Sequence, residues 1–130
     1  MVEASKSTDD VAHELRLALE TADLSMFGEL LDDNVTWGPP DVEPAPCQNR
    51  QQVLAWYQRA RASGARATIS EVDVIGSRIL VGLVTRGTPN ARDRGGHATR
   101  WQIYSVREGR VVDIVGFEQK TEALAWLSRA

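Results

Sequence analysis

The fold is decided by residues 100–117, Arg100-Trp-Gln-Ile-Tyr-Ser-Val-Arg-Glu-Gly-Arg-Val-Val-Asp-Ile-Val-Gly-Phe117. Two runs in which apolar and polar residues alternate flank Glu108-Gly109, which is typical of a two-residue hairpin turn. Residues 121–127, Thr-Glu-Ala-Leu-Ala-Trp-Leu, follow with the apolar spacing of a short helix. We therefore predict the last hairpin of a curved sheet, with a helix folded after it.

Two helices are predicted at the start of the chain. Ser7 and Asp10 form a plausible capping arrangement, and apolar residues then recur on one helical face over residues 8–22. Asp23 can cap a second helix, and we expect the polar run 32–34, Asp-Asp-Asn, to end it. The pattern indicates two amphipathic helices that bury one face each.

A short strand, a loop and a third helix come next. Val-Thr-Trp at 35–37 is a predicted strand, and residues 38–46 hold four of the five prolines, so they form neither helix nor central strand. This loop is expected to cross the surface or the rim of a cavity. Asn49 can cap a third helix that ends at Gly64.

The period changes from helical to strand-like after residue 65. Strands are predicted over 67–75 and over 78–86, the latter so continuously apolar that both of its faces should be buried. Residues 88–96 form a mobile hairpin loop, since they hold turn-forming residues and charges. We predict one domain over 1–130, with 1–7 disordered. Its class is α+β, with three N-terminal helices on the concave face of a curved, mostly antiparallel sheet.

Composition excludes several classes of protein. The net charge is −3 without a basic cluster, which disfavours nucleic-acid binding. No apolar run approaches the roughly 18 residues of a membrane span, so no membrane is expected. Cys47 is the only cysteine, which rules out an internal disulfide and makes a reducing cytoplasm the default. His13, His97 and Cys47 are too few for a zinc site, and no phosphate-binding glycine motif is present, so no cofactor is expected.

Three segments resemble the SnoaL-like proteins, many of them small and bacterial, of the nuclear transport factor 2-like superfamily. They are residues 30–37, Leu-Leu-Asp-Asp-Asn-Val-Thr-Trp; residues 47–57, Cys-Gln-Asn-Arg-Gln-Gln-Val-Leu-Ala-Trp-Tyr; and residues 106–112, Val-Arg-Glu-Gly-Arg-Val-Val. The resemblance spans residues 8–128 and implies the cone-shaped fold of that superfamily. It does not define an activity, because the superfamily holds isomerases, polyketide cyclases, dehydratases, epoxide hydrolases and non-catalytic binding modules.

The resemblance also argues against one mechanism. Ketosteroid isomerases of this superfamily use a carboxylate base and two acidic hydrogen-bond donors, and this chain has Gly38-Pro39, Leu15 and Trp101 at the matching positions. None of these side chains can exchange a proton. The pair Trp56-Tyr57 does match the aromatic residues that line the cavity of those enzymes. We expect a retained cavity without that catalyst.

The register of the hairpin decides which residues of the sheet face the cavity. With a two-residue turn, Ile103 faces Ile114 and Trp101 faces Gly116 on the cavity side, while Asp113 points outward. A type I turn with a glycine bulge shifts the pairing by one residue and brings Asp113 beside Ile103. We favour the first register because it groups the apolar residues. Seven residues are then predicted to border one ligand pocket: Trp37, Trp56, Tyr57, Trp101, Ile103, Ile114 and Gly116.

Several conspicuous residues also have a structural interpretation. Trp126 is expected to anchor the last helix on the sheet, and Cys47 to be a buried small side chain rather than a nucleophile. The candidate acids and bases are Tyr57, His97 and Asp113, although an exposed loop histidine is the simpler interpretation of His97.

Two functions remain open. One is non-catalytic binding of a small apolar molecule; the alternative is a cofactor-independent acid-base enzyme, of cyclase, isomerase, dehydratase or hydrolase type, on a polyketide- or terpene-like substrate. We also predict a homodimer through the convex face of the sheet, because the apolar run 79–84 should leave that face too apolar for water.

Overall fold

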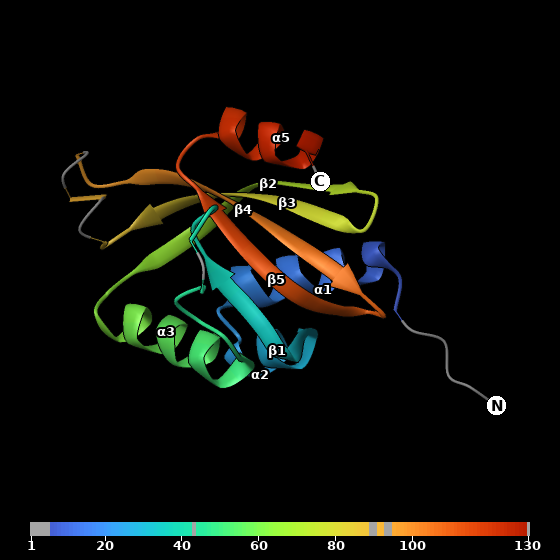
Figure 1. The fold of residues 1–130 in the computed structure, drawn as a ribbon. Coiled ribbons are helices and arrows are strands. Elements are labelled where there is room, and N and C mark those ends of the chain that lie inside the picture. The colour runs from blue at the N-terminus through green and yellow to red at the C-terminus, as the bar shows by residue number, and fades with distance from the viewer. Residues whose placement is uncertain (1–5, 43, 89–90, 93–94, 130) are drawn as a thin grey trace.

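The computed structural model describes residues 6–42, 44–88, 91–92 and 95–129 of the chain, and it has the α+β architecture that the sequence predicts. Helices come first, a five-stranded sheet follows, and one helix ends the chain (Figure 1). The elements are α1 (Thr8–Thr21), α2 (Leu24–Leu30), β1 (Leu31–Gly38), α3 (Arg50–Ala62), β2 (Arg66–Ile75), β3 (Arg78–Arg86), β4 (Ala98–Arg107), β5 (Arg110–Phe117) and α5 (Lys120–Arg129).

Each of the first three helices begins at the predicted cap. The Ser7 side chain accepts a hydrogen bond from the Asp10 amide, and the Asp10 carboxylate accepts one from the Ser7 amide. Asp23 caps α2 and Asn49 caps α3 in the same way, through the backbone N–H three residues on. These caps satisfy amide donors that have no partner within the helix, so the sequence alone locates the helix starts.

The end of α2 differs from the prediction. The helix stops at Leu30, and β1 starts at Leu31, so the run 32–34 lies inside a strand and does not close the helix. Leu31 is fully buried, and it pairs with Val111 of β5. The pairing with β5 is irregular between Leu31 and Thr36, and within this stretch the Asp32 carboxylate accepts a hydrogen bond from the Asn34 amide at 3.0 Å. The polar run therefore keeps a local turn contact, while the tertiary pairing of Leu31 makes the chain a strand from that residue on.

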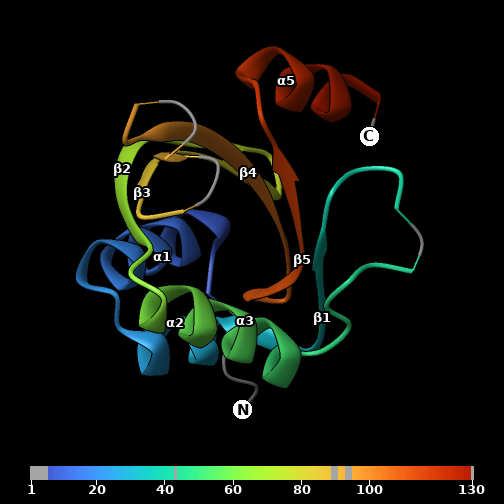
Figure 2. The same cartoon turned by 90° about the vertical axis from the view of Figure 1, so that its left-hand side faces the viewer.

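The sheet has the strand order β1-β5-β4-β3-β2, in which only β1 and β5 run parallel. It is strongly bent, and α1, α2 and α3 lie in its hollow, whereas α5 lies across the opposite face (Figures 1 and 2). We call these the concave and the convex face. The predicted curved sheet with three N-terminal helices on its concave side is confirmed.

The β4–β5 hairpin corrects the favoured register. Glu108 and Gly109 do form a two-residue turn, both with positive φ (51° and 77°), and Arg107 pairs with Arg110. The register then shifts by one residue between Ser105 and Val106. The pairing skips one residue of β5, as in a β-bulge, and every pair beyond this point differs from the prediction.

The observed pairs show the consequence of the bulge. Tyr104 lies opposite Ile114, Gln102 opposite Gly116, and Trp101 opposite Phe117. The predicted pairing of Trp101 with Gly116 is therefore wrong. The alternative with a bulge at the turn is also wrong, because Asp113 lies opposite Ser105 and not beside Ile103.

Both faces of β3 are buried, as predicted. Ile79, Val81 and Leu83 point into the main core beneath α1, whereas Leu80 points into a second cluster beneath α5. The second cluster consists of Leu80, Ile103, Phe117 and Ala123, with Trp101, Val115, Trp126 and Leu127 packed against it. The chain thus covers much of the convex face itself.

Two expectations fall partly outside the described residues. Disorder over 1–7 concerns mainly residues 1–5, which are not described, and Ser7 is the α1 cap. Residues 89–90 and 93–94 of the expected loop are not described either; within the rest of that loop Ala91 is fully buried and its amide donates to the Thr88 hydroxyl. Among the described helices, none is long and apolar enough to cross a membrane.

Candidate functional site

A cavity of about 500 Å³ lies between the first three helices and the concave face of the sheet. Exposed side chains such as Trp56, Arg61 and Arg66 border it, so it is open to solvent. Its lining consists of Ala18, Leu19, Glu20, Thr21, Ala22, Asp23, Leu24, Phe27, Trp37, Trp56, Tyr57, Ala60, Arg61, Ala65, Arg66, Ala67, Leu83, Thr85, Thr88, Arg100 and Gln102.

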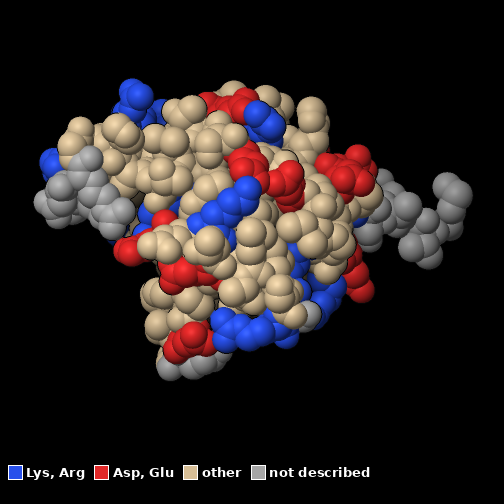
Figure 3. Space-filling model, turned by 90° about the horizontal axis from the view of Figure 1, so that it is seen from above, with Lys and Arg blue, Asp and Glu red and all other residues tan. Residues whose placement is uncertain are grey.

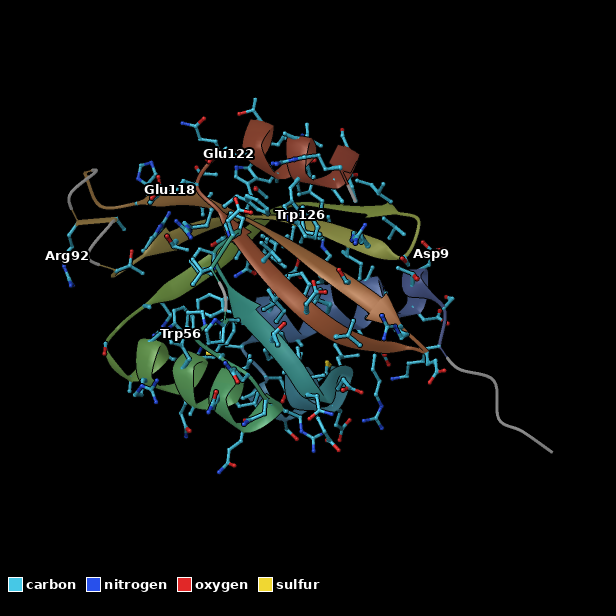
Figure 4. The ribbon with its side chains drawn as sticks, viewed as in Figure 1. Asp9, Trp56, Arg92, Glu118, Glu122 and Trp126 are labelled. Carbon is cyan, nitrogen blue, oxygen red and sulfur yellow. The ribbon has the colours of Figure 1, made fainter. Side chains whose placement is uncertain are left out.

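An aromatic wall forms one side of this cavity. The ring centroids of Trp37 and Trp56 are 4.1 Å apart, and the ring of Tyr57 stands edge-on to Trp56 at 5.2 Å. Phe27 of α2 continues the wall at 4.9 Å from Tyr57. Figure 4 shows Trp56 on the side of α3 that faces the sheet. Tilted and edge-to-face rings of this kind offer a large apolar surface with a defined shape.

A polar chain starts at the buried side of this wall. The Tyr104 hydroxyl donates to Oε1 of Gln102, and Nε2 of Gln102 donates to the Tyr57 hydroxyl at 3.4 Å. Burial raises the pKa of Tyr57, and it raises that of Tyr104 well above the usual value. Both phenols are therefore neutral near pH 7 and act as hydrogen-bond groups rather than bases.

Five charged side chains border the cavity, and they come from both helices and strands: Glu20, Asp23, Arg61, Arg66 and Arg100. Two are acidic, and both already have partners: the Glu20 carboxylate accepts from Arg16 Nε at 2.9 Å, and Asp23 caps α2. Arg66 donates to the backbone carbonyls of Arg61 and Ala65. Arg100 of β4 is, with Arg66 of β2, one of the two basic residues that the sheet contributes to the lining.

Three of the seven predicted pocket residues line the cavity. Trp37 comes from β1, and Trp56 and Tyr57 come from α3, where their helical spacing aims them at the sheet. Ile114 belongs to the core on the concave side, and Gly116 lies opposite Gln102 on that same side, but neither is part of the lining. The helical spacing of α3 therefore predicted the positions of Trp56 and Tyr57 correctly.

Trp101 and Ile103 are placed wrongly. Both lie on the convex face, where Ile103 is fully buried and Trp101 packs against the cluster under α5. The bulge in β5 is the reason, because a one-residue change of register moves a strand's side chains relative to the faces of the sheet. Trp101 consequently does not occupy a cavity position equivalent to the isomerase aspartate, and Gln102 faces the cavity instead.

Only one of the three candidate acids and bases lies at the cavity. Tyr57 is part of the lining, whereas His97 is an exposed residue just before β4 and lies outside it. Asp113 lies on the convex face opposite Ser105, and its Oδ1 is buried without a hydrogen-bond partner in the described part of the chain. The structure therefore does not bring the three groups together.

Sequence reasoning missed Gln102 and Arg100, which alternate with Trp101 on β4 and face the cavity. The polar residues of the alternating run were the available signal, but the favoured register placed them on the outside of the sheet.

The predicted placements of Cys47 and Trp126 are confirmed. Cys47 is buried with Sγ 3.8 Å from the Gln52 carbonyl, and burial raises the pKa of its thiol. Trp126 packs between α5 and the sheet, 6.1 Å from Phe117 (Figure 4).

The combination of a bent five-stranded sheet, helices in its hollow and a cavity between them defines the class of NTF2-like proteins. Residues 12–114 match the SnoaL-like domain. The chain therefore belongs to the SnoaL-like family, as its sequence motifs imply. None of the curated proteins matches the sequence.

Solved structures with the same fold have low sequence identity to this chain. An NTF2-like protein of unknown function from Cytophaga hutchinsonii is 11% identical, with a TM-score of 0.66 over 95% of this chain and 99% of that chain. A "putative polyketide cyclase" from Sinorhizobium meliloti is 19% identical, with a TM-score of 0.65 over 86% of this chain and 100% of that one. A second protein of that name, from Pseudomonas putida, is 14% identical, with a TM-score of 0.67 over 92% and 97%. At these identities the likeness concerns the fold.

Proposed function

We propose that this protein binds a small molecule with a largely apolar body in the cavity, without converting it. The observation that carries the proposal is the aromatic wall of Phe27, Trp37, Trp56 and Tyr57 around a space of about 500 Å³. A cavity of this size and lining is typical of sites for small organic ligands. Burial of the ligand's apolar surface would supply most of the affinity.

Tyr57 gives this pocket one oriented hydrogen bond. Its hydroxyl oxygen accepts from Gln102 and lies next to the Tyr104 hydroxyl, so its own hydrogen can be donated to Tyr104 or to a bound ligand. A carbonyl, ether or hydroxyl oxygen on the ligand is the matching acceptor. This contact would fix the orientation of the ligand, because the aromatic surfaces around it are not directional.

The placement of the other candidate groups supports binding over acid-base catalysis. A general base must come within hydrogen-bond reach of the proton that it removes and needs a pKa near the working pH. His97 and Asp113 lie away from the cavity lining, and the raised pKa of Tyr57 leaves it protonated. Of the three candidates, the alternative of a polyketide- or terpene-directed enzyme, which the names of some structural neighbours suggest, thus keeps only the neutral phenol of Tyr57 in the pocket. The two carboxylates of the lining, Glu20 and Asp23, already accept hydrogen bonds from Arg16 and from the Met26 amide.

Two alanines of α3 provide a matched test. Ala60 lines the cavity, whereas Ala62 is exposed at the end of the helix and does not. We expect naphthalene-2-carboxamide, a neutral probe with one carbonyl oxygen, to quench tryptophan emission of the parent protein. The Ala60→Phe variant should bind it at least about tenfold more weakly, because the added ring fills the pocket, whereas Ala62→Phe should bind normally. Equal binding by both variants would contradict the proposal.

A homodimer and a cytoplasmic location are retained as proposals. The apolar run 79–84 supports the dimer less than the sequence suggested, because α5 of the same chain buries Leu80 on the convex face. Leu124 on the outside of α5 remains 43% exposed, and Figure 3, which views the α5 side, shows uncharged surface among side chains of both signs. Light scattering should give about twice the 14.3 kDa of one chain; a value near one chain at micromolar concentration would reject the dimer.

A further inference from the structure

The binding proposal uses none of the charged groups at the cavity, and one of them, Arg100, lies on the sheet beside Gln102. This residue lies on the concave side of β4, where it is opposite Leu83 of β3 and two residues from Gln102. Its Nη2 is also the nearest group to the bare backbone of Gly116, at 3.6 Å from the position a Cβ would take there. The guanidinium therefore lies over the sheet at one side of the pocket.

Arg100 has unused donors. Its side chain is 34% exposed, and the nearest acidic oxygen, Oε1 of Glu118, is 3.7 Å from Nη1, beyond hydrogen-bond distance. Across the described residues, Arg100 makes no side-chain hydrogen bond. A guanidinium presents five N–H donors in a planar fork that matches a carboxylate in a bidentate arrangement. Glu118 is thus a loose ion-pair partner of Arg100, and the remaining donors of the guanidinium can bind a ligand carboxylate through charge-assisted hydrogen bonds.

The other charges at the border do not compete for this position. Glu20 and Asp23 are the carboxylates of the lining, and each is engaged, with Arg16 and with the α2 backbone respectively. Arg61 and Arg66 add positive charge to the same border. An anion entering the pocket therefore meets three guanidinium groups, whereas a cation meets two carboxylates that already have partners.

We infer that the ligand of this pocket is an amphipathic organic acid whose carboxylate is bound by Arg100. The inference rests on the proposed binding function and adds the chemical class of the ligand. Arg100 and Gln102 are two residues apart on β4, so both side chains lie on the cavity side of the strand. The matching ligand has its carboxylate at Arg100, a neutral oxygen at Tyr57, and an apolar body against the aromatic wall. This ligand differs from the small apolar molecule expected from the sequence, because Arg100 and Gln102 were not among the residues predicted to border the pocket.

Two probes of nearly equal shape test the charge. Naphthalene-2-carboxylate and naphthalene-2-carboxamide are titrated separately into the full chain, and tryptophan quenching gives each Kd. The parent protein should bind the carboxylate about tenfold or more tightly than the carboxamide, the effect of one charge-assisted hydrogen-bond pair. Arg100→Met should reduce this preference to about twofold or less while binding of the carboxamide persists. Arg110→Met, which changes an exposed arginine at the hairpin end, is the control and should keep the parent preference.

A second variant keeps the test independent of any folding effect at Arg100. Glu118 is 60% exposed, and Glu118→Gln removes the one acid near the guanidinium. The preference for the carboxylate should stay or increase. Equal binding of the two probes by the parent, an unchanged preference in Arg100→Met, or a reduced preference in Glu118→Gln would each overturn the inference and leave the binding function standing. Failure of both probes to bind the parent would overturn both.

Discussion

The two faces of the sheet use the same strands for different purposes. On the convex face, the side chains of Ile103, Leu80 and Phe117 are almost completely buried under α5. On the concave face, the intervening residues of β4, Arg100 and Gln102, border an open cavity. One face is thus closed by the chain itself, and the other keeps polar groups beside an unfilled space.

The comparison shows how a small domain can combine stability with a binding site. Packing under α5 stabilises the sheet from the side where no ligand has to enter. The concave face can then leave a cavity between the helices and the sheet, although an unfilled space in a core usually lowers stability. We expect substitutions on the convex face to change stability and substitutions at the cavity to change binding.

The largest effect should come from Ile103→Ala. Ile103 is fully buried on the convex face, so the truncation should cost about 2–5 kcal/mol of unfolding free energy. The affinity for naphthalene-2-carboxamide should not change, because Ile103 lies on the other side of the sheet from the cavity. Urea unfolding and quenching titrations measure the two quantities. Ile75→Ala, at a position that is 44% exposed, is the stability control. Weaker probe binding by folded Ile103→Ala protein would contradict the conclusion that the convex face does not contribute to the pocket.

Two glycines on opposite faces give the next largest contrast. A Cβ at Gly82 would lie 2.6 Å from the Trp101 ring, whereas a Cβ at Gly116 would have only Arg100 Nη2 nearby, at 3.6 Å. Neither glycine has a positive φ, so contact alone distinguishes them. Gly82→Ala should destabilise the protein by about 1–3 kcal/mol, and Gly116→Ala by less than about 0.5 kcal/mol. Denaturant midpoints of the two variants test this; equal midpoints would show that the convex face is no more tightly packed.

Tyr104→Phe tests the polar chain behind the cavity. Removing the hydroxyl leaves Oε1 of the nearly buried Gln102 without its donor, which should cost about 1–3 kcal/mol. Adding Gln102→Leu to this variant should recover part of the loss, because the stranded acceptor is removed as well. Chemical unfolding of the single and double variants provides the measurement. Additive losses in the double variant would mean that the two groups do not interact.

The smallest expected effect is a change of stability with pH that depends on the hydroxyl groups of Tyr57 and Tyr104. Burial raises the folded-state pKa of Tyr57 and Tyr104 above the unfolded value of about 10, so the protonated form favours the folded state. This contribution is complete below pH 10 and is lost as the pH rises from there through the folded pKa values. Urea midpoints should therefore decrease as the pH rises above about 10, more steeply in the parent than in the variant carrying Tyr57→Phe and Tyr104→Phe. Parallel curves of urea midpoint against pH for the two proteins would contradict a contribution from these phenols.

Local signals in the sequence were sufficient for most of the fold. Ser7, Asp23 and Asn49 cap their helices as predicted, because a cap depends on groups within three residues. The run 78–86 is buried on both faces, as its continuous apolar character indicates. The start of β1 was not predictable in this way, because Leu31 becomes a strand residue by pairing with Val111, 80 residues further along the chain.

The same distinction between local contacts and long-range contacts applies to the residues of the site. The sequence by itself determined the helices, the two-residue turn at Glu108-Gly109 and the helix side that presents Trp56 and Tyr57, because these follow from contacts between near neighbours. It also indicated the SnoaL-like fold, through the resemblance of its motifs to that family. Only the tertiary structure decided that Gln102 and Arg100, rather than Trp101 and Ile103, face the cavity. The physical reason is that side chains alternate with a period of two along a strand, so one extra residue in β5 changes which pairs meet, and that extra residue is visible only in the pairing between the strands.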